Sequence, residues 1–136
     1  MNAKTVRFNK AIEFYGNSEW GNTIFFDEGD SSYVVIGSVW DSINYIRTYL
    51  NKFDKDGNLL SYNAFRESGV SDYYAGSGGA LKQLSSGNYI NVGGVERFNP
   101  FDRDMMFYKF TKKTDTILKK NYDLLNMTVG WASCIH

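Results

Sequence analysis

The residues able to carry catalysis are few in this chain of 136 residues. Its only histidine, His136, is the last residue, and a chain end is usually too poorly ordered to hold a general base. Schemes that activate a serine or a cysteine through a histidine therefore lack their central member. The only cysteine, Cys134, falls in an expected strand, where a small packed residue is the simpler interpretation.

Paired carboxylates could cleave a glycoside if both faced one substrate. Asp102 and Asp104 flank Arg103 and would share one strand face, but a polar strand entrance explains them more simply. We therefore expect no enzymatic activity and no cofactor.

One acidic turn opens like a calcium-binding loop. Residues 54–58 read Asp-Lys-Asp-Gly-Asn, but a calcium loop needs glycine at its sixth position and glutamate at its twelfth. Those positions hold Leu59 and Phe65. The same residues suit a tight hairpin turn with Gly57 at positive φ, and we predict that turn without a bound metal. A weak calcium site completed by a neighbouring loop is the alternative.

A second acidic turn carries Asp27, Glu28 and Asp30, and carboxylate oxygens are the ligands that hard cations prefer. Residues 84–86 (Leu-Ser-Ser) occupy the equivalent turn later in the chain, so the repeated pattern does not require acid there. We predict a solvated, charged loop tip and no metal site.

Aromatic residues carry the stronger functional signal, with ten tyrosines, ten phenylalanines and three tryptophans. Aromatic rings flanked by polar groups suit a sugar ring or the side chain of a protein partner. Two equivalent strand-end loops carry such groups, and the alternative is that their rings cover the gap between repeated units. The predicted ligand-binding residues are Trp40, Asp41, Phe98, Phe101 and Arg103, with Tyr73 and Tyr74 as a second candidate.

The charges exclude one class of partner. Lys and Arg together number 15, as do Asp and Glu, so the net charge is zero and the basic face that binds nucleic acid is not expected. A near-neutral surface offers little repulsion between copies, which is compatible with self-association. No stretch approaches the roughly 18 apolar residues of a membrane span, and the first residues lack the apolar run of a signal peptide. Any export signal would lie outside this sequence.

The elements that must position these residues are repeated. Residues 29–38 return as residues 86–94, so that Tyr33 corresponds to Tyr89 at a distance of 56 positions. A third copy begins at residues 131–135, which resemble residues 20–24, and Trp20 and Trp131 are interpreted as equivalent core residues. A fixed period of this kind marks an array of equal supersecondary units.

The segments that follow each copy recur as well. Residues 52–53 (Lys-Phe) return as residues 109–110 after 57 positions, and residues 59–60 (Leu-Leu) as residues 117–118 (Ile-Leu) after 58.

Between polar turns the chain shows short alternating segments, which are typical of strands. Residues 44–53 also have apolar residues at helical spacing, but the short, aromatic partner segment 104–111 favours a strand. Residues 68–79 are a loose stretch of glycine, serine and tyrosine. The expected strands are residues 22–26, 33–40, 44–53 and 59–65 in the first unit, 78–84, 88–95, 103–111 and 116–122 in the second, and 5–15 and 128–135 at the two ends.

These motifs resemble the repeats of bacterial secreted and surface β-propeller proteins. Those repeats commonly read Asp-Gly-Gly-Tyr-φ-φ-φ-Gly, where φ is apolar, followed by Lys-φ-Asp-x-Asn-Gly-Asn-φ-φ-Trp. The likeness covers about residues 5–135 and is carried by residues 86–94 and by residues 52–60. Ser61 and Lys119 stand where the family has its tryptophan, and the second turn lacks the glycine.

The resemblance implies an all-β fold of antiparallel four-stranded blades. It also implies a non-catalytic recognition or structural module of a secreted or cell-surface protein. Together with the aromatic loops, this predicts binding of a carbohydrate or protein partner at the rim of the blades.

We expect one β domain over residues 1–136, with repeat units at about residues 20–66 and 76–124 and partial units at 5–15 and 128–135. A propeller closes with about four to eight blades, so these units form an incomplete propeller. The partial units would expose strand edges, which we expect to pair with each other or with another copy in a homo-oligomer. The alternative is a barrel or sandwich of about ten strands that binds a small apolar ligand.

Overall fold

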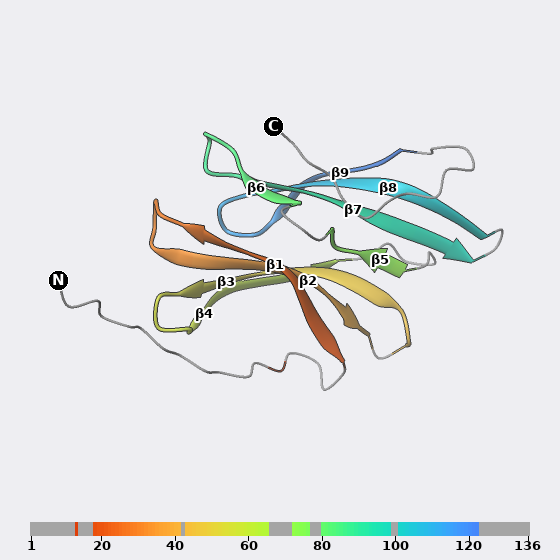
Figure 1. The fold of residues 1–136 in the computed structure, drawn as a ribbon, viewed down its shortest axis with the longest axis horizontal. Coiled ribbons are helices and arrows are strands. Elements are labelled where there is room, and N and C mark those ends of the chain that lie inside the picture. Colours follow the sequence, from red (N-terminus) through yellow and green to blue (C-terminus); the bar gives the residue numbers. More distant parts are fainter. Residues whose placement is uncertain are drawn as a thin grey trace.

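A computed structural model describes residues 18–41, 43–65, 72–76, 80–98 and 101–122, together with residue 13. These residues form strands and turns in two antiparallel sheets, which lie one above the other (Figure 1). The all-β fold class is therefore confirmed. The described residues contain no helix, and so none that is long and apolar enough to cross a membrane.

The first sheet is a meander of four strands in the order β1 (Glu19–Asp27), β2 (Ser32–Trp40), β3 (Ile46–Asp54) and β4 (Leu59–Phe65). Each strand pairs with the next through a hairpin, as alternating sequences separated by polar turns predict. The segment with helical spacing is the strand β3, in agreement with the strand interpretation. Trp20, interpreted above as a core residue, is 37% exposed, because β1 is an edge strand.

The second sheet repeats this order with one interruption. Its path is β5 (Asp72–Tyr74), β7 (Tyr89–Phe98), β8 (Phe101–Phe110) and β9 (Thr116–Tyr122), and β6 (Leu81–Gln83) also pairs with β7. Two short strands thus share the place that β1 fills in the first sheet. The sequence missed β5, which lies within the stretch described above as loose.

The hairpin β7–β8 is longer than expected. Residues 96–103 were predicted as a loop, but Glu96 lies opposite Arg103 and Phe98 lies opposite Phe101 within the ladder. Opposite charges facing each other across the strands favour this pairing. The outer strands expected at residues 5–15 and 128–135 fall outside the described residues, apart from Glu13, which belongs to no strand.

The strand register agrees with the predicted repeat. Tyr33 pairs with Phe53 in the first sheet, as Tyr89 pairs with Phe110 in the second. Both sheets have an irregularity just before the equivalent phenylalanine, between Lys52 and Phe53 and between Lys109 and Phe110.

One correspondence needs correction. Leu59 lies opposite Phe53, and Thr116 lies opposite Phe110, so Leu59 corresponds to Thr116 and not to Ile117. Because both sheets carry the irregularity at the same place, no extra residue separates the fourth strands, and the offset stays at 57.

Equivalent glycines allow the first strand position of each sheet to approach the second closely. A Cβ atom at Gly37 would overlap the carbonyl oxygen of Trp20, and one at Gly93 would overlap the carbonyl oxygen of Tyr74. The register of β1 shifts beside this point, between Gly21 and Thr23, and the first position of the second sheet is interrupted after β5. Both glycines are therefore required by a backbone approach that the two sheets share.

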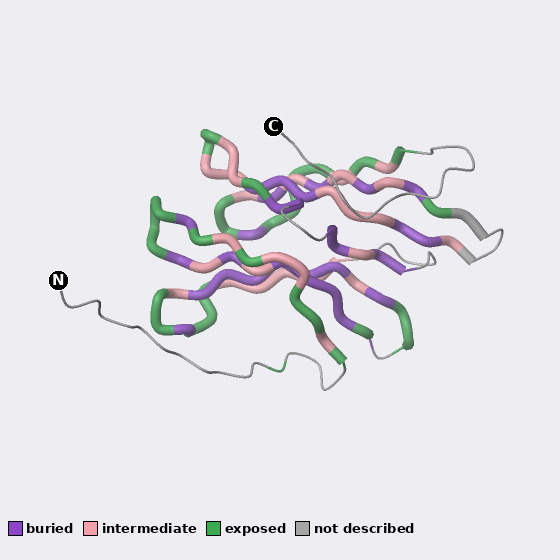
Figure 2. The backbone as a smooth tube through the Cα atoms, in the orientation of Figure 1, coloured by how far each residue is buried: buried purple, intermediate pink, exposed green. Residues whose placement is uncertain are grey.

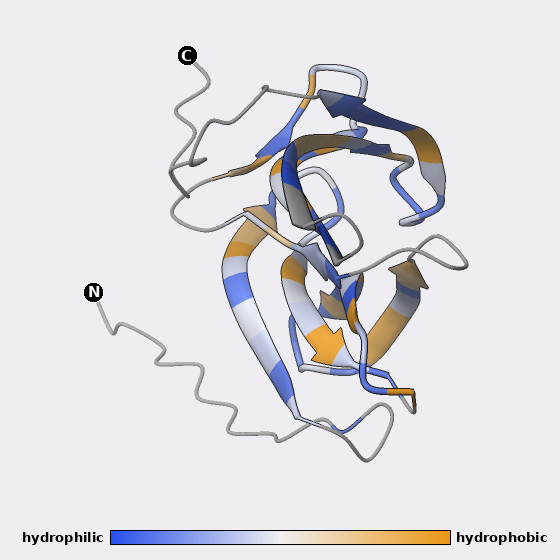
Figure 3. Cartoon of the chain, turned by 90° about the vertical axis from the view of Figure 1, so that its right-hand side faces the viewer, coloured by the Kyte–Doolittle hydropathy of each residue, from blue (hydrophilic) through white to orange (hydrophobic). Residues whose placement is uncertain are grey.

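The core lies between the two sheets. Figure 2 shows the buried residues along the strands and the exposed ones mainly in the hairpins, and Figure 3 shows hydrophobic and hydrophilic residues in turn along the strands. The rings of Phe65 and Tyr108 meet across the interface with centroids 4.7 Å apart. The buried cluster comprises Val34, Ile36, Leu50, Tyr73, Ala75, Leu81, Tyr89, Val95, Met106, Tyr108 and Phe110.

Candidate functional site

The tips of the β2–β3 and β7–β8 hairpins lie at the same end of the molecule, on the right in Figure 1. We call this end the hairpin rim and define it by residues 40–47, 72–74 and 96–104. Nearly all of the predicted ligand-binding residues are located here. The repeat explains this placement, because equivalent hairpins leave equivalent ends of two stacked sheets.

Asp41 organises the β2–β3 loop. Its carboxylate accepts hydrogen bonds from the backbone N–H groups of Ile43 (2.9 Å) and Tyr45 (3.0 Å), and it is paired with Arg47 Nε at 3.0 Å. The side chain of Asp41 is buried, so it braces the loop and does not face solvent.

The braced loop presents three large side chains to solvent. Trp40 is 38% exposed, and Ile43 and Tyr45 are also exposed. The sequence interpretation singled out Trp40 but missed the other two. Ile43 had been weighed only as part of a helical spacing, and the Asx-type role of Asp41 was the signal that could have identified an ordered loop.

The β7–β8 hairpin carries ion pairs beside its tip. Arg103 pairs with Glu96 at 3.0 Å, and Arg97 pairs with the buried Asp104. Asp104 therefore serves a structural ion pair. Phe98 and Phe101 form the last opposed pair of the ladder, and the Arg103 side chain is 45% exposed.

The strand β5 joins the two hairpins. Asp72 accepts a hydrogen bond from Ile46 N–H in the first sheet (2.7 Å), and the Tyr74 hydroxyl contacts both Asp72 (3.3 Å) and Glu96 (3.2 Å). Burial and the two neighbouring carboxylates raise the pKa of Tyr74 above its ordinary value, so the hydroxyl stays protonated. Tyr73 is fully buried in the core, because β5 lies between β3 and β7, and its ring is not on the binding surface predicted for it.

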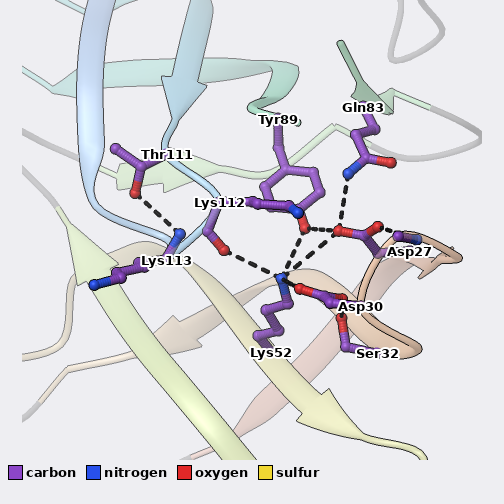
Figure 4. A network of polar contacts seen from close by, with 10 residues as sticks. Asp27, Asp30, Ser32, Lys52, Gln83, Tyr89, Thr111, Lys112 and Lys113 are labelled. Carbon is purple, nitrogen blue, oxygen red and sulfur yellow. Dashed lines mark hydrogen bonds and ion pairs between the residues drawn. The ribbon is translucent and has the colours of Figure 1, made fainter. Parts of the chain in front are cut away.

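A second polar cluster lies at the opposite end of the sheets (Figure 4). Lys52 Nζ is 2.5 Å from Asp30 Oδ2 and 3.6 Å from Asp27 Oδ2, and it donates hydrogen bonds to the Tyr89 hydroxyl (3.1 Å) and the Lys112 carbonyl (3.2 Å). The cluster joins the first sheet to the second at a point where no surface residue was predicted.

Asp27 is fully buried in this cluster, which corrects the prediction that its turn is a solvated loop tip. Its carboxylate accepts hydrogen bonds from the Tyr89 hydroxyl (2.5 Å) and from Gln83 Nε2 (2.8 Å). Glu28 and Asp30 remain on the exposed side of the turn. The second sheet covers Asp27, and single-sequence patterns do not show which loop another sheet will cover.

The charges of the cluster are set by its contacts. Burial opposes ionisation of Asp27, but the hydrogen bonds from Tyr89, Gln83 and the Gly29 N–H, with the Lys52 charge, outweigh it and lower the pKa of Asp27. Burial and the hydrogen bond to Asp27 raise the pKa of Tyr89. The Lys52 ammonium thus occupies the position between two carboxylates that a cation would take. Among the described residues, no group of three or more His, Cys, Asp or Glu side chains could hold a metal ion.

The acidic β3–β4 turn is the hairpin turn that the sequence predicts. Gly57 has φ of 81°, and the Asp54 carboxylate accepts hydrogen bonds from the N–H groups of Asp56 (2.9 Å) and Asn58 (2.8 Å). In the second sheet Thr111 takes the part of Asp54, and Thr114, with φ of 72°, stands in the place of Gly57. The polar residues of these turns satisfy their own backbone.

His136 and Cys134 lie outside the described residues, as does the side chain of Asp102. No protein-family model, no curated protein and no solved structure matches this chain.

Proposed function

We propose that this chain is a non-catalytic, β-propeller-type module of a secreted or cell-surface bacterial protein, which binds a carbohydrate or protein partner through the hairpin rim. The observation that carries the proposal is the braced β2–β3 loop, in which Asp41 holds Trp40, Ile43 and Tyr45 at the surface. Large rings on an ordered loop are the usual anchors of recognition surfaces.

Order in the loop favours binding for a physical reason. A flexible loop loses conformational entropy when a partner fixes it, which weakens binding by about 0.5–1.5 kcal/mol for each immobilised side chain. The bonds from Asp41 to Ile43, Tyr45 and Arg47 order this loop before a partner arrives. The exposed face of Trp40 can then stack on a sugar ring, and nearby ionic groups such as Arg103 can bind its hydroxyl groups.

The propeller-type assignment is supported by the repeated four-strand order and by the shared glycine approach at Gly37 and Gly93. The location in a secreted or surface protein is supported by the sequence resemblance of the repeats. The barrel alternative is not favoured, because neither sheet closes on itself within the described strands. The space between the sheets is occupied by the buried core residues.

The test is a combined Trp40→Ala and Phe98→Ala variant, compared with wild type on arrays of glycans and of extracellular proteins. Loss of an anchor ring costs about 2 kcal/mol or more, so binding of the best hit should weaken roughly 30-fold or more. The thermal midpoint should move by less than about 4 °C. The matched control is Trp20→Ala, which removes an equally exposed tryptophan from the edge strand β1 and should leave binding unchanged.

Two results would contradict the proposal. If neither array yields a hit for the wild-type chain, the rim is not a recognition surface for these partners. If the double variant loses much of its stability, Trp40 and Phe98 are core residues, and the proposed surface has lost its anchors.

A further inference from the structure

The two sheets bury faces that are not equivalent in the repeat. Residues directly opposite each other on neighbouring antiparallel strands point to the same face. In the first sheet the buried face carries Val34 and its partner Lys52, and in the second it carries Tyr89 and its partner Phe110. The repeat equivalent of Tyr89 is Tyr33, which neighbours Val34 and therefore lies on the opposite, outer face of the first sheet. The sheets are thus stacked head to tail.

Head-to-tail stacking leaves one face of each sheet without a partner among the described strands. The outer face of the second sheet corresponds to the face that the first sheet buries. Its residues keep the chemical character of their equivalents, position by position. Ile90, Val92, Phe107, Lys109 and Tyr122 stand in place of Val34, Ile36, Leu50, Lys52 and Phe65.

The outer face of the first sheet corresponds in the same way to the face that the second sheet buries. Ile24 lies opposite Val35 as Leu81 lies opposite Asn91, so the 64% exposed Ile24 is the equivalent of a core leucine. The equivalents on this face are Ile24, Tyr33, Val39, Tyr49 and Phe53 for Leu81, Tyr89, Val95, Met106 and Phe110.

Individual contacts of the internal interface also have their counterparts on the outer faces. Lys52 Nζ is 3.1 Å from the Tyr89 hydroxyl and 5.5 Å from the centre of its ring. The equivalent lysine and tyrosine are Lys109, on the outer face of the second sheet, and Tyr33, on the outer face of the first.

An aromatic contact follows the same rule. The rings of Phe65 and Phe110 lie 5.3 Å apart across the internal interface. Their equivalents are Tyr122, which is 39% exposed, and Phe53. A solvated outer face would alternate with polar residues and would not need these groups.

We propose that a second copy of this chain docks its second sheet onto the outer face of the first sheet of its neighbour. The docking repeats the internal interface, with Lys109 and Tyr122 of one copy against Tyr33 and Phe53 of the next. This contact uses surfaces that are separate from the hairpin rim, so it stands or falls independently of partner binding there. It is heterologous, and copies add in one direction until a ring closes or the supply ends.

Two variants separate this contact from any symmetric dimer. The donor-face variant is Lys109→Asp with Tyr122→Asp, and the acceptor-face variant is Ile24→Asp with Phe26→Asp, where Phe26 is exposed beside Tyr33. All four new side chains are acidic, so the variants do not attract each other. Lys113→Asp, in the exposed β8–β9 turn, is the control and should associate like wild type.

Sedimentation velocity between about 10 μM and 1 mM, the range in which weak interfaces assemble, measures the outcome. The wild-type mass should rise beyond that of a dimer, and each variant alone should remain monomeric. An equimolar mixture of the two variants should form a one-to-one dimer and nothing larger, because each contributes one intact face. A wild-type chain that remains monomeric at 1 mM, or a variant that still self-associates, would overturn the proposal, and the wild-type result holds even if a variant does not fold.

Discussion

Polar contacts from both sheets converge on Lys52. Its ammonium group contacts Asp27 and Asp30 in the first sheet and Tyr89 in the second, while its side chain is almost wholly buried. Removing one partner of a buried ion pair leaves the other charge without compensation, which is more costly than the pair is stabilising. The network is therefore expected to matter more for the joint between the sheets than its few contacts suggest.

Replacing Lys52 by methionine should lower the free energy of unfolding by about 3–5 kcal/mol, because Asp27 would stay buried without its cation. The same replacement at the repeat equivalent, Lys109→Met, should change it by less than about 0.5 kcal/mol, since Lys109 lies on an outer face. Urea denaturation at low micromolar protein concentration, where copies do not associate, compares the two variants. Equal losses would show that Lys52 contributes only its packing.

The same network makes the fold sensitive to acid. The pKa values of Asp27 and Asp30 are lowered in the folded chain, whereas an unfolded aspartate has its ordinary pKa of about 4. The unfolded state therefore binds more protons as the pH falls below about 5, and stability present at neutral pH is lost through the folded pKa values. Denaturation midpoints from pH 7 to 3 should fall more steeply for wild type than for Asp27→Asn. Parallel curves would remove Asp27 as the source.

At the scale of elements, the local pattern predicts strands where turns and alternation agree. The strands at residues 59–65 and 116–122 lie where the sequence placed them. The strand β5 was missed because three residues carry no periodicity of their own, and contacts such as the one from Asp72 to Ile46 come from the other sheet. The turn at Thr114 was recognised only through its repeat, since threonine at positive φ is rare.

Glycine at the shared backbone approach should be irreplaceable. Gly37→Ala and Gly93→Ala should each lower the free energy of unfolding by about 1–3 kcal/mol, because a Cβ atom would overlap a backbone carbonyl. Gly21→Ala is the matched control within the same sheet, where the added carbon would meet Val35 at an ordinary 3.6 Å and the change should stay within about 0.5 kcal/mol. Chemical denaturation compares all three, and a loss at Gly21 as large as at Gly37 would contradict the overlap as the cause.

At the scale of the whole molecule, the sequence predicted the all-β class and the ends of the hairpins, but not which face of each sheet is buried. Trp40 and Arg103 could be placed at one rim because the repeat relates their hairpins. The joint of Asp27, Lys52 and Tyr89 could not be predicted, since these residues are distant in sequence and meet only when the sheets stack. Stacking depends on the summed shape of two faces, and no local pattern encodes it.

The position of Asp27 gives the two kinds of joint different strengths. Leu84 stands at its place in the second unit, so an interface built by Lys109 brings no equivalent carboxylate from that unit. The joint inside one chain therefore holds a buried charge network, and a joint between copies holds mainly apolar contacts. Assembly would then come apart on dilution while every chain keeps its fold, and acid would loosen the chain itself before it affected the contacts between chains. The order of units is written in a single exchange of aspartate for leucine.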